Sequence, residues 1–169
     1  DCSALYTRRP ESFRNALSLI PEYLRTNTGG VVDLMDYSFQ LGRRFRALKL
    51  WFVFRCFGTE GIAARIREHA RIARELAQWI DSHPQIERLA PVPFSVVCFR
   101  VHPLGIDDEA RLQSLNASVL EKVNASGEVF LSHTKLHGRY SLRVAVGNLQ
   151  TTLERVRRAL DLVCAAAGI

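Results

Sequence analysis

Two histidines in the second half of the chain have the spacing of a metal-binding pair. His133 and His137 are four residues apart, which on a helix would place both imidazoles on one face. They fall, however, where apolar and polar residues alternate as in a hairpin, and no third ligand lies nearby in the sequence. We therefore expect no metal site.

The stretch 36–55, DYSFQLGRRFRALKLWFVFR, mixes basic and large apolar residues and permits three interpretations: nucleic-acid binding, membrane binding or burial. On a helix from Arg43 to Phe57, both kinds of residue surround the axis. A nucleic-acid helix gathers its cations on one face, and a membrane-surface helix segregates its faces. A helix that is apolar all round is enclosed by protein. We predict a buried helix whose cations pair with carboxylate, phosphate or carbonyl groups, and neither nucleic acid nor membrane as a partner.

Leu41 and Gly42 lead into this helix. A glycine at a helix start lets backbone or a ligand approach closely. The spacing alone favours the simpler interpretation, a tight turn packed against a neighbouring element.

Composition is that of an ordinary globular chain, with 47% hydrophobic and 24% charged residues in 169 positions. The net charge of +6 is weak support for an anionic partner. No apolar run approaches the roughly 18 residues of a membrane-spanning helix. Four widely spaced cysteines predict buried thiols in a reducing compartment rather than disulfides: Cys2, Cys56, Cys98 and Cys164.

Hydrophobic periodicity predicts an α+β fold, with helices packed on a small antiparallel sheet of about three strands. Gly58 should end the first helix in a left-handed conformation, and Thr59 should cap the next. The apolar positions of that next helix are Ile62, Ile66, Ala70, Ala73, Leu76 and Ile80. The predicted elements are strand 2–7, loop 21–30, helices 43–57 and 60–82, strand 94–101, a helix from 107, a hairpin of 128–134 and 139–146, and a last helix capped by Thr151.

The run LGRRFRALKLWFVFR, with DCSALYTRR before it and SVVCFR and YSLRVAVGN after it, resembles a known family. It is similar to the carboxy-terminal part of the pyridoxal-phosphate-dependent amino acid decarboxylases of the aromatic-L-amino-acid decarboxylase type. The resemblance extends from Asp1 to about Val163 and implies the C-terminal portion of a fold-type I enzyme. Residues 1–42 would end the large domain, 43–83 would form connecting helices, and 84–169 would form the small C-terminal domain.

The family's cofactor lysine lies shortly before its DCSA segment, so the resemblance places that lysine upstream of Asp1. The lysines present, Lys49, Lys122 and Lys135, lack its sequence context. We therefore expect a piece of a longer, cytoplasmic, homodimeric enzyme, with no cofactor-binding residue in this chain. Pyridoxal 5'-phosphate would serve the intact enzyme, and the piece alone should be inactive.

Tyr23 is the catalytic candidate that the resemblance supplies, since the family carries a tyrosine in a mobile loop, here about 21–33. A phenol has a pKa of about 10 and can donate a proton at neutral pH. After carbon dioxide leaves the amino acid, Tyr23 would protonate the α-carbon. Related aldehyde synthases commonly carry phenylalanine here, so tyrosine favours decarboxylation.

Gly42, with Leu41, matches the family's substrate-pocket residues, where histidine decarboxylases carry a serine. Glycine leaves room for an aromatic substrate of the tyrosine, dopa or tryptophan type. The stretch between Asp36 and Leu41 departs from the animal enzymes, which are longer there and carry a tryptophan and a proline. Two alternatives remain open: a non-catalytic α+β interaction module, and an aromatic aldehyde synthase of the same family.

Overall fold

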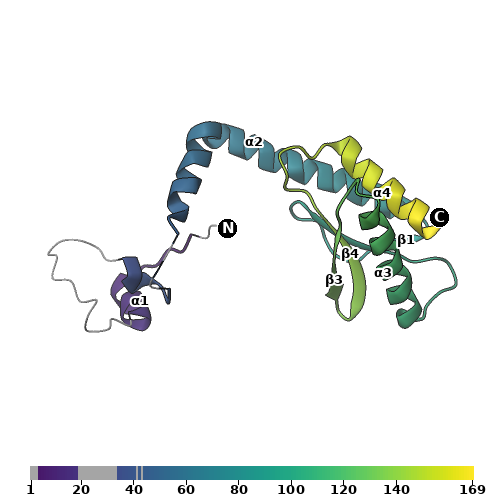
Figure 1. Ribbon diagram of the computed structural model, residues 1–169, viewed down its shortest axis with the longest axis horizontal. Coiled ribbons are helices and arrows are strands. Elements are labelled where there is room, and N and C mark those ends of the chain that lie inside the picture. The colour runs from purple at the N-terminus through teal and green to yellow at the C-terminus, as the bar shows by residue number, and fades with distance from the viewer. Residues whose placement is uncertain (1–3, 19–33, 41, 43) are drawn as a thin grey trace. The chain divides into compact units, whose positions relative to one another are not determined.

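The computed structural model describes residues 4–18, 34–40, 42 and 44–169. Two compact units divide the chain, residues 1–59 and residues 60–169, and each is described by itself. In chain order the elements are α1 (Pro10–Leu17), the 3-10 helix η2 (Leu34–Tyr37), α2 (Arg46–Ser82), β1 (Ile86–Arg88), β2 (Val96–Val101), α3 (Glu109–Ala125), β3 (Ser132–Leu136), β4 (Arg139–Ala145) and α4 (Leu153–Ala167) (Figure 1).

In the first unit, helix α1 occupies a stretch for which the sequence predicts no element. Pro10 occupies its first turn, where a missing N–H costs nothing. The predicted strand 2–7 is wrong for residues 4–7, which form no strand. Among the described residues of this unit no strand lies alongside to share a hydrogen-bond ladder, and Thr7 instead accepts a hydrogen bond from the Arg9 N–H at 3.0 Å.

Helix α2 is interrupted at Gly58, whose φ of 65° and ψ of 171° are not helical. The sequence predicts a positive φ at this position, and glycine adopts it without steric cost. The predicted helix 43–57 begins at Arg46 instead of Arg43. No residue of α2 before Ile72 is buried, so the predicted enclosure by protein is not provided by the described residues and stays a prediction for the intact enzyme. No described element of the first unit covers this stretch.

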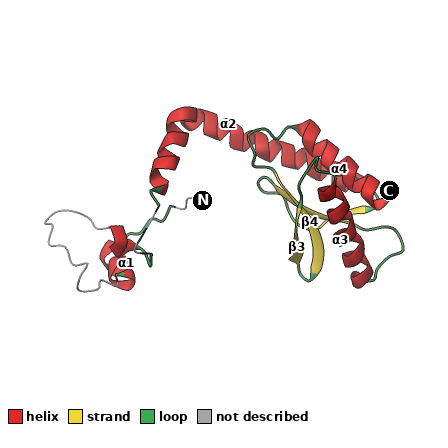
Figure 2. Cartoon of the chain, in the orientation of Figure 1, coloured by secondary structure: helices red, strands yellow, loops and turns green. Residues whose placement is uncertain are grey.

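The four strands form one antiparallel sheet in the order β1-β2-β4-β3, one strand more than predicted (Figure 2). Phe99 of β2 pairs with Leu142 of β4, and Leu142 pairs in turn with His133 of β3. The β3–β4 turn uses His137 (φ 50°) and Gly138 (φ 81°). Two successive positive φ values match the twist of a two-residue hairpin.

The core of the second unit fills the space between the sheet and helices α2, α3 and α4. Each helix contributes apolar residues three or four positions apart, and the strands contribute alternate ones. The α+β prediction is therefore confirmed. The largest fully buried side chains are Phe99, Ile72, Leu76, Ile80, Leu112, Leu142, Val97, Val101, Val119, Val123, Val146 and Val163.

Asn116 joins helix α3 to the end of β2 inside this core. Its Oδ1 accepts from the Val101 N–H and its Nδ2 donates to the Val101 carbonyl, both at 2.8 Å. Nδ2 also donates to the Leu112 carbonyl at 2.9 Å. The side chain is fully buried, so it completes the hydrogen bonding of a strand end that water does not reach.

A second polar cluster crosses the sheet around Arg100. Its guanidinium is 4% exposed and lies 2.7 Å from Glu87 of β1 and 2.8 Å from Glu109 of α3. Glu87 also pairs with Arg139 of β4 at 3.1 Å. The buried charge is thus compensated, as a low-dielectric environment requires.

Three further predictions need correction. Strand β1 is absent from the predicted elements. The cap of α4 is Thr152, which accepts from the Arg155 N–H at 3.3 Å, and not Thr151. The described cysteines are free thiols, but Cys56 is exposed, while Cys98 and Cys164 are half-buried.

We predict that Asn116→Leu lowers the free energy of unfolding by about 2–4 kcal/mol, because it leaves both Val101 backbone groups buried without partners. Gln113→Leu, on the exposed side of the same helix, should change it by less than about 0.5 kcal/mol. Urea unfolding followed by circular dichroism measures both. Equal effects of the two changes would contradict the role of Asn116.

Candidate functional site

Of the residues predicted to act in a site, only Gly42 lies within the part of the chain that the structure describes. Tyr23 and Leu41 lie outside the described residues. Gly42 is exposed in a bend, and a β-carbon added there would meet nothing within 4 Å. Close packing against a neighbouring element therefore does not explain why residue 42 is a glycine, as far as this chain shows.

An ion pair joins the two described segments that flank residues 19–33. Arg14 of α1 donates from Nε to the Oδ2 atom of Asp36 at 3.0 Å, and its Nη2 lies 2.8 Å from the same oxygen. Ser18 donates to Oδ1 at 3.4 Å. The Asp36 carboxylate is 3% exposed, and the hydrogen bond to it raises the pKa of Arg14.

This pair, with its neighbouring ring contact, holds α1 against η2. The rings of Phe13 and Tyr37 lie 6.4 Å apart between centroids. Residues 18 and 36 are thereby held close together. They flank residues 19–33, the segment that contains Tyr23. Sequence reasoning missed Arg14 and Asp36 because 22 positions separate them and no periodic pattern links them.

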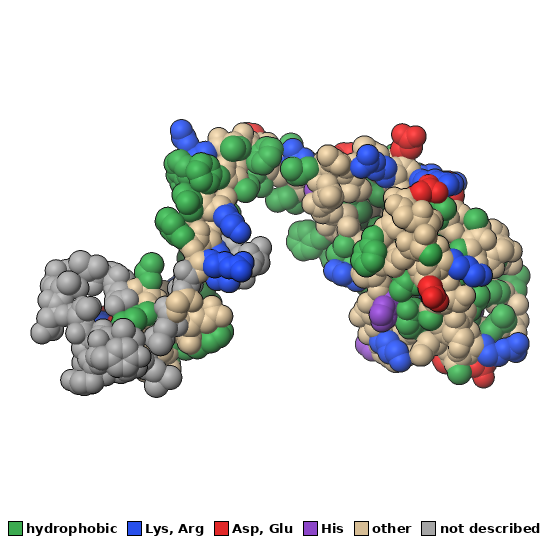
Figure 3. Space-filling view, in the orientation of Figure 1, with side chains coloured by type: hydrophobic (Ala, Val, Ile, Leu, Met, Phe, Trp, Pro, Cys, Tyr) green, Lys and Arg blue, Asp and Glu red, His purple; other side chains and the backbone are tan. Residues whose placement is uncertain are grey.

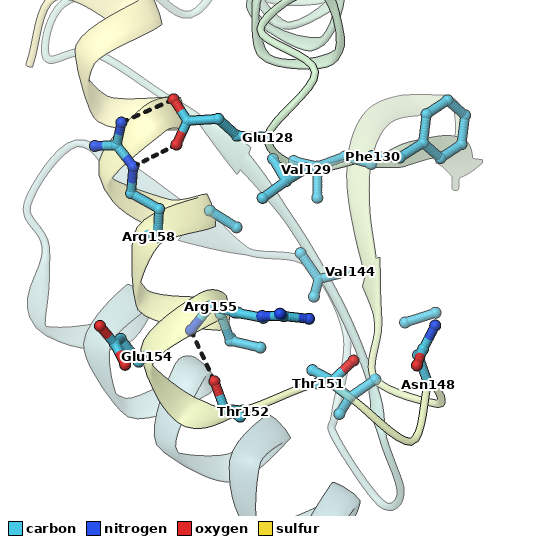
Figure 4. A pocket seen from close by; sticks show the side chains of 15 residues that line it. Glu128, Val129, Phe130, Val144, Asn148, Thr151, Thr152, Glu154, Arg155 and Arg158 are labelled. Atoms are coloured by element: carbon cyan, nitrogen blue, oxygen red, sulfur yellow. Dashed lines mark hydrogen bonds and ion pairs between the residues drawn. The ribbon is translucent and has the colours of Figure 1, made fainter.

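In the second unit, the 128–131 segment, the end of β4 and the first turns of α4 border a cavity of about 1000 Å³ (Figure 4). Its wall is polar and apolar in about equal parts, with Arg155 directed into the space. Arg158 closes one side through a two-fold hydrogen bond to Glu128, at 2.8 and 2.9 Å. That hydrogen bond lowers the pKa of Glu128.

The residues that line this cavity include no histidine, cysteine, lysine or tyrosine. Its ionisable groups are Glu128 and Glu154, with Arg155 and Arg158. The cavity therefore lacks histidine, the side chain whose ordinary pKa lies nearest neutrality. The cavity is not the site to which the sequence pointed.

The two histidines considered for a metal site have separate roles in the hairpin. His133 stacks on Tyr140 with ring centroids 5.0 Å apart, and His137 forms the turn. Over the described ranges, no cluster of three or more histidine, cysteine, aspartate or glutamate side chains could hold a metal ion. None of the described helices is both long and apolar enough to cross a membrane.

Among the described residues, no lysine borders a pocket that could hold pyridoxal phosphate. The cofactor needs a lysine for its imine bond in a pocket. Lys49, Lys122 and Lys135 are all exposed, and none lines the cavity described above. None of these three lysines is therefore placed to form the imine.

Comparison with known proteins identifies the family. The family model described as "Pyridoxal-dependent decarboxylase conserved domain" matches residues 1–102. Tryptophan decarboxylase TDC2 of Camptotheca acuminata is 39% identical over 166 residues, 96% of this chain and 33% of the relative. Phenylacetaldehyde synthase of Arabidopsis thaliana is also 39% identical over 166 residues, 96% of this chain and 34% of the relative.

A solved structure extends the likeness to the fold. The crystal structure of Oryza sativa TDC with PLP and tryptamine superposes with a TM-score of 0.79 at 31% identity, over 92% of this chain and 33% of that one. The chain spans about a third of the length of the curated relatives that it matches.

We predict that Asp36→Asn loosens α1 from η2, because the neutral amide keeps no ion pair with Arg14. Amide hydrogen exchange over residues 10–17 should become faster. Glu11→Gln removes an exposed carboxylate from the same helix and serves as the control, with unchanged exchange expected. Mass spectrometry of the exchanged peptides measures both, and equal rates in the two variants would contradict the structural role of Asp36.

Proposed function

The chain belongs to the pyridoxal-dependent decarboxylase family, and from this premise we propose that it is the C-terminal third of an enzyme that converts an aromatic L-amino acid to its amine. Residues 1–42 would end the large domain, 43–83 would connect, and 84–169 would form the small domain. The intact enzyme would be a cytoplasmic homodimer. The observation that carries the proposal is the family match over residues 1–102.

The cofactor lysine would lie in the preceding part of the polypeptide, since no lysine here suits it. When bound, pyridoxal phosphate would supply the electron sink for loss of carbon dioxide. This chain would supply the proton, from the Tyr23 hydroxyl to the α-carbon of the substrate. The Arg14–Asp36 pair supports this role because it fixes both ends of the segment that carries Tyr23.

The substrate class is supported by Gly42 and by the relatives. A β-carbon added at Gly42 would meet nothing within 4 Å in this chain, and a glycine leaves more room for a large substrate side chain than a serine would. The relatives include a tryptophan decarboxylase, and the rice structure was solved with tryptamine. We propose a substrate of the tyrosine, dopa or tryptophan type.

Aldehyde synthesis is the second candidate, because a phenylacetaldehyde synthase is as similar as a tryptophan decarboxylase. In this reaction the decarboxylated intermediate reacts with oxygen. Tyr23 decides between the two, since a proton donor beside the α-carbon favours the amine.

The proposal is tested on the full-length protein with its cofactor, incubated with L-tyrosine, L-tryptophan or L-dopa. Chromatography with mass spectrometry should identify amines as the products. Tyr23→Phe should lower amine formation by about 10²-fold or more, the usual contribution of a general acid, and should release aldehyde with uptake of oxygen.

Tyr6→Phe is the matched control, because Tyr6 is 91% exposed and the same hydroxyl is removed. It should leave both products unchanged. Normal amine output from Tyr23→Phe would show that Tyr23 is not the proton donor. Aldehyde as the main wild-type product would favour the second candidate.

Gly42→Ser tests the substrate pocket. Because an added β-carbon meets nothing in this chain and the backbone is not in a positive-φ conformation, the melting temperature of the full-length enzyme should not change. The kcat/KM for L-tryptophan should fall about tenfold or more, as in a pocket reduced by about one heavy atom. A smaller fall is expected for L-tyrosine, and equal falls for both substrates would contradict a pocket role.

A further inference from the structure

The first part of α2 and the residues before it expose an unusual amount of apolar surface. We name residues 44–57 the basic–apolar segment. Figure 3 shows its green apolar side chains interspersed with blue basic ones. Eight large apolar residues in it are between 40% and 73% exposed: Phe45, Leu48, Leu50, Trp51, Phe52, Val53, Phe54 and Phe57.

The same helix behaves differently after Gly58. There Ile72, Leu76 and Ile80 are at most 1% exposed, because the sheet and two helices cover them. Soluble proteins seldom leave a continuous apolar patch of this kind in water, and such patches mark interaction sites. The basic–apolar segment therefore has the character of an interaction surface, and the described residues of the first unit do not cover it.

The partner must surround the segment. At 100° per residue, the apolar positions from Leu48 to Phe57 leave no gap wider than about 100° around the axis. A flat partner would cover one face and leave the others in water. The segment instead fits a groove that encloses it on several sides.

The partner must also be acidic. Between Asp36 and Glu60 the sequence has five basic residues and no aspartate or glutamate. Arg55 lies over the Trp51 ring at 5.8 Å from its centroid, a contact that leaves its charge without a carboxylate. If Lys49 and Arg55 are covered, the covering surface must supply carboxylates, since a charge buried alone is costly.

A second copy of this chain does not meet these requirements. Two copies of the segment packed together would oppose cations with cations. Of the 17 carboxylates of the chain, eight among the described residues already pair with arginines of the same copy. Those paired in this way are Asp36, Glu68, Glu75, Asp81, Glu87, Glu109, Glu128 and Asp161.

We propose that the basic–apolar segment is the docking surface for the preceding part of the same polypeptide, which encloses it in an apolar groove bordered by carboxylates. This inference rests on the proposed function, in which the chain is one third of a longer enzyme. The curated relatives are about three times as long as the stretch that this chain matches, which leaves ample polypeptide to form such a groove.

Cys56 is the probe, because it lies in the segment and is exposed in this chain. Full-length protein is pulsed with N-ethylmaleimide, and mass spectrometry of peptides gives the rate at each cysteine. If the groove covers the segment, Cys56 should react more than about tenfold slower than in the urea-unfolded protein, which corresponds to about 1.4 kcal/mol. The rate should not change on dilution, since the cover is in the same polypeptide.

Charge reversal tests the carboxylates. Lys49→Glu with Arg55→Glu should restore fast labelling of Cys56 in the full-length protein. The control, Arg67→Glu with Arg74→Glu, makes the same charge change at exposed positions after Gly58 and should leave labelling slow. Cys164, half-buried and with a pKa raised by burial, should label slowly throughout and shows that the second unit is folded.

The outcomes are distinct. Fast labelling of Cys56 in the folded wild-type protein overturns the proposal without any variant. Protection that is lost on dilution assigns the surface to a second copy instead. Slow labelling that charge reversal does not change excludes the acidic groove. Slow labelling in a protein without decarboxylase activity rejects the proposed function and leaves the docking surface in place.

Discussion

The need to keep apolar surface out of water explains why the two halves of helix α2 differ in burial. After Gly58 the helix places its apolar side on a sheet and two other helices, and it forms much of the core of the second unit. Before Gly58 the helix is also rich in apolar residues, but the described residues of the first unit do not cover it. A single positive-φ glycine thus separates a part that completes its own core from a part that needs more protein.

The elements that could be predicted from sequence are those whose burial follows one period. The later part of α2, together with α3, β4 and α4, alternates or repeats as a half-buried helix or strand should. Ile66 breaks the pattern, at 55% exposed, because the packing of α2 begins only near Ile72. Strand β1 gave no signal, since a three-residue strand shows no period and exists through its pairing with β2.

The polar interior was the least predictable part of the fold. Asparagine and arginine usually lie at the surface, but Asn116 and Arg100 are both buried. Each is buried because a partner far along the chain satisfies it, Val101 in one case and Glu87 with Glu109 in the other. The Arg14–Asp36 pair is of the same kind. Periodicity reports which face of an element is apolar, and it carries no information about such pairings.

The choice between amine and aldehyde as product depends on far fewer residues than the fold does. A decarboxylase and an aldehyde synthase are both 39% identical to this chain, so the scaffold does not separate the two reactions. The proposed difference is one phenolic oxygen, because a donor at the α-carbon gives the amine and its absence leaves the carbon open to oxygen. One hydroxyl group does not change the pattern of apolar residues along the chain. Periodicity therefore cannot point to Tyr23, and only the resemblance to the family does. The role proposed for Tyr23 is supported by the buried carboxylate of Asp36, which joins the two segments that flank residues 19–33.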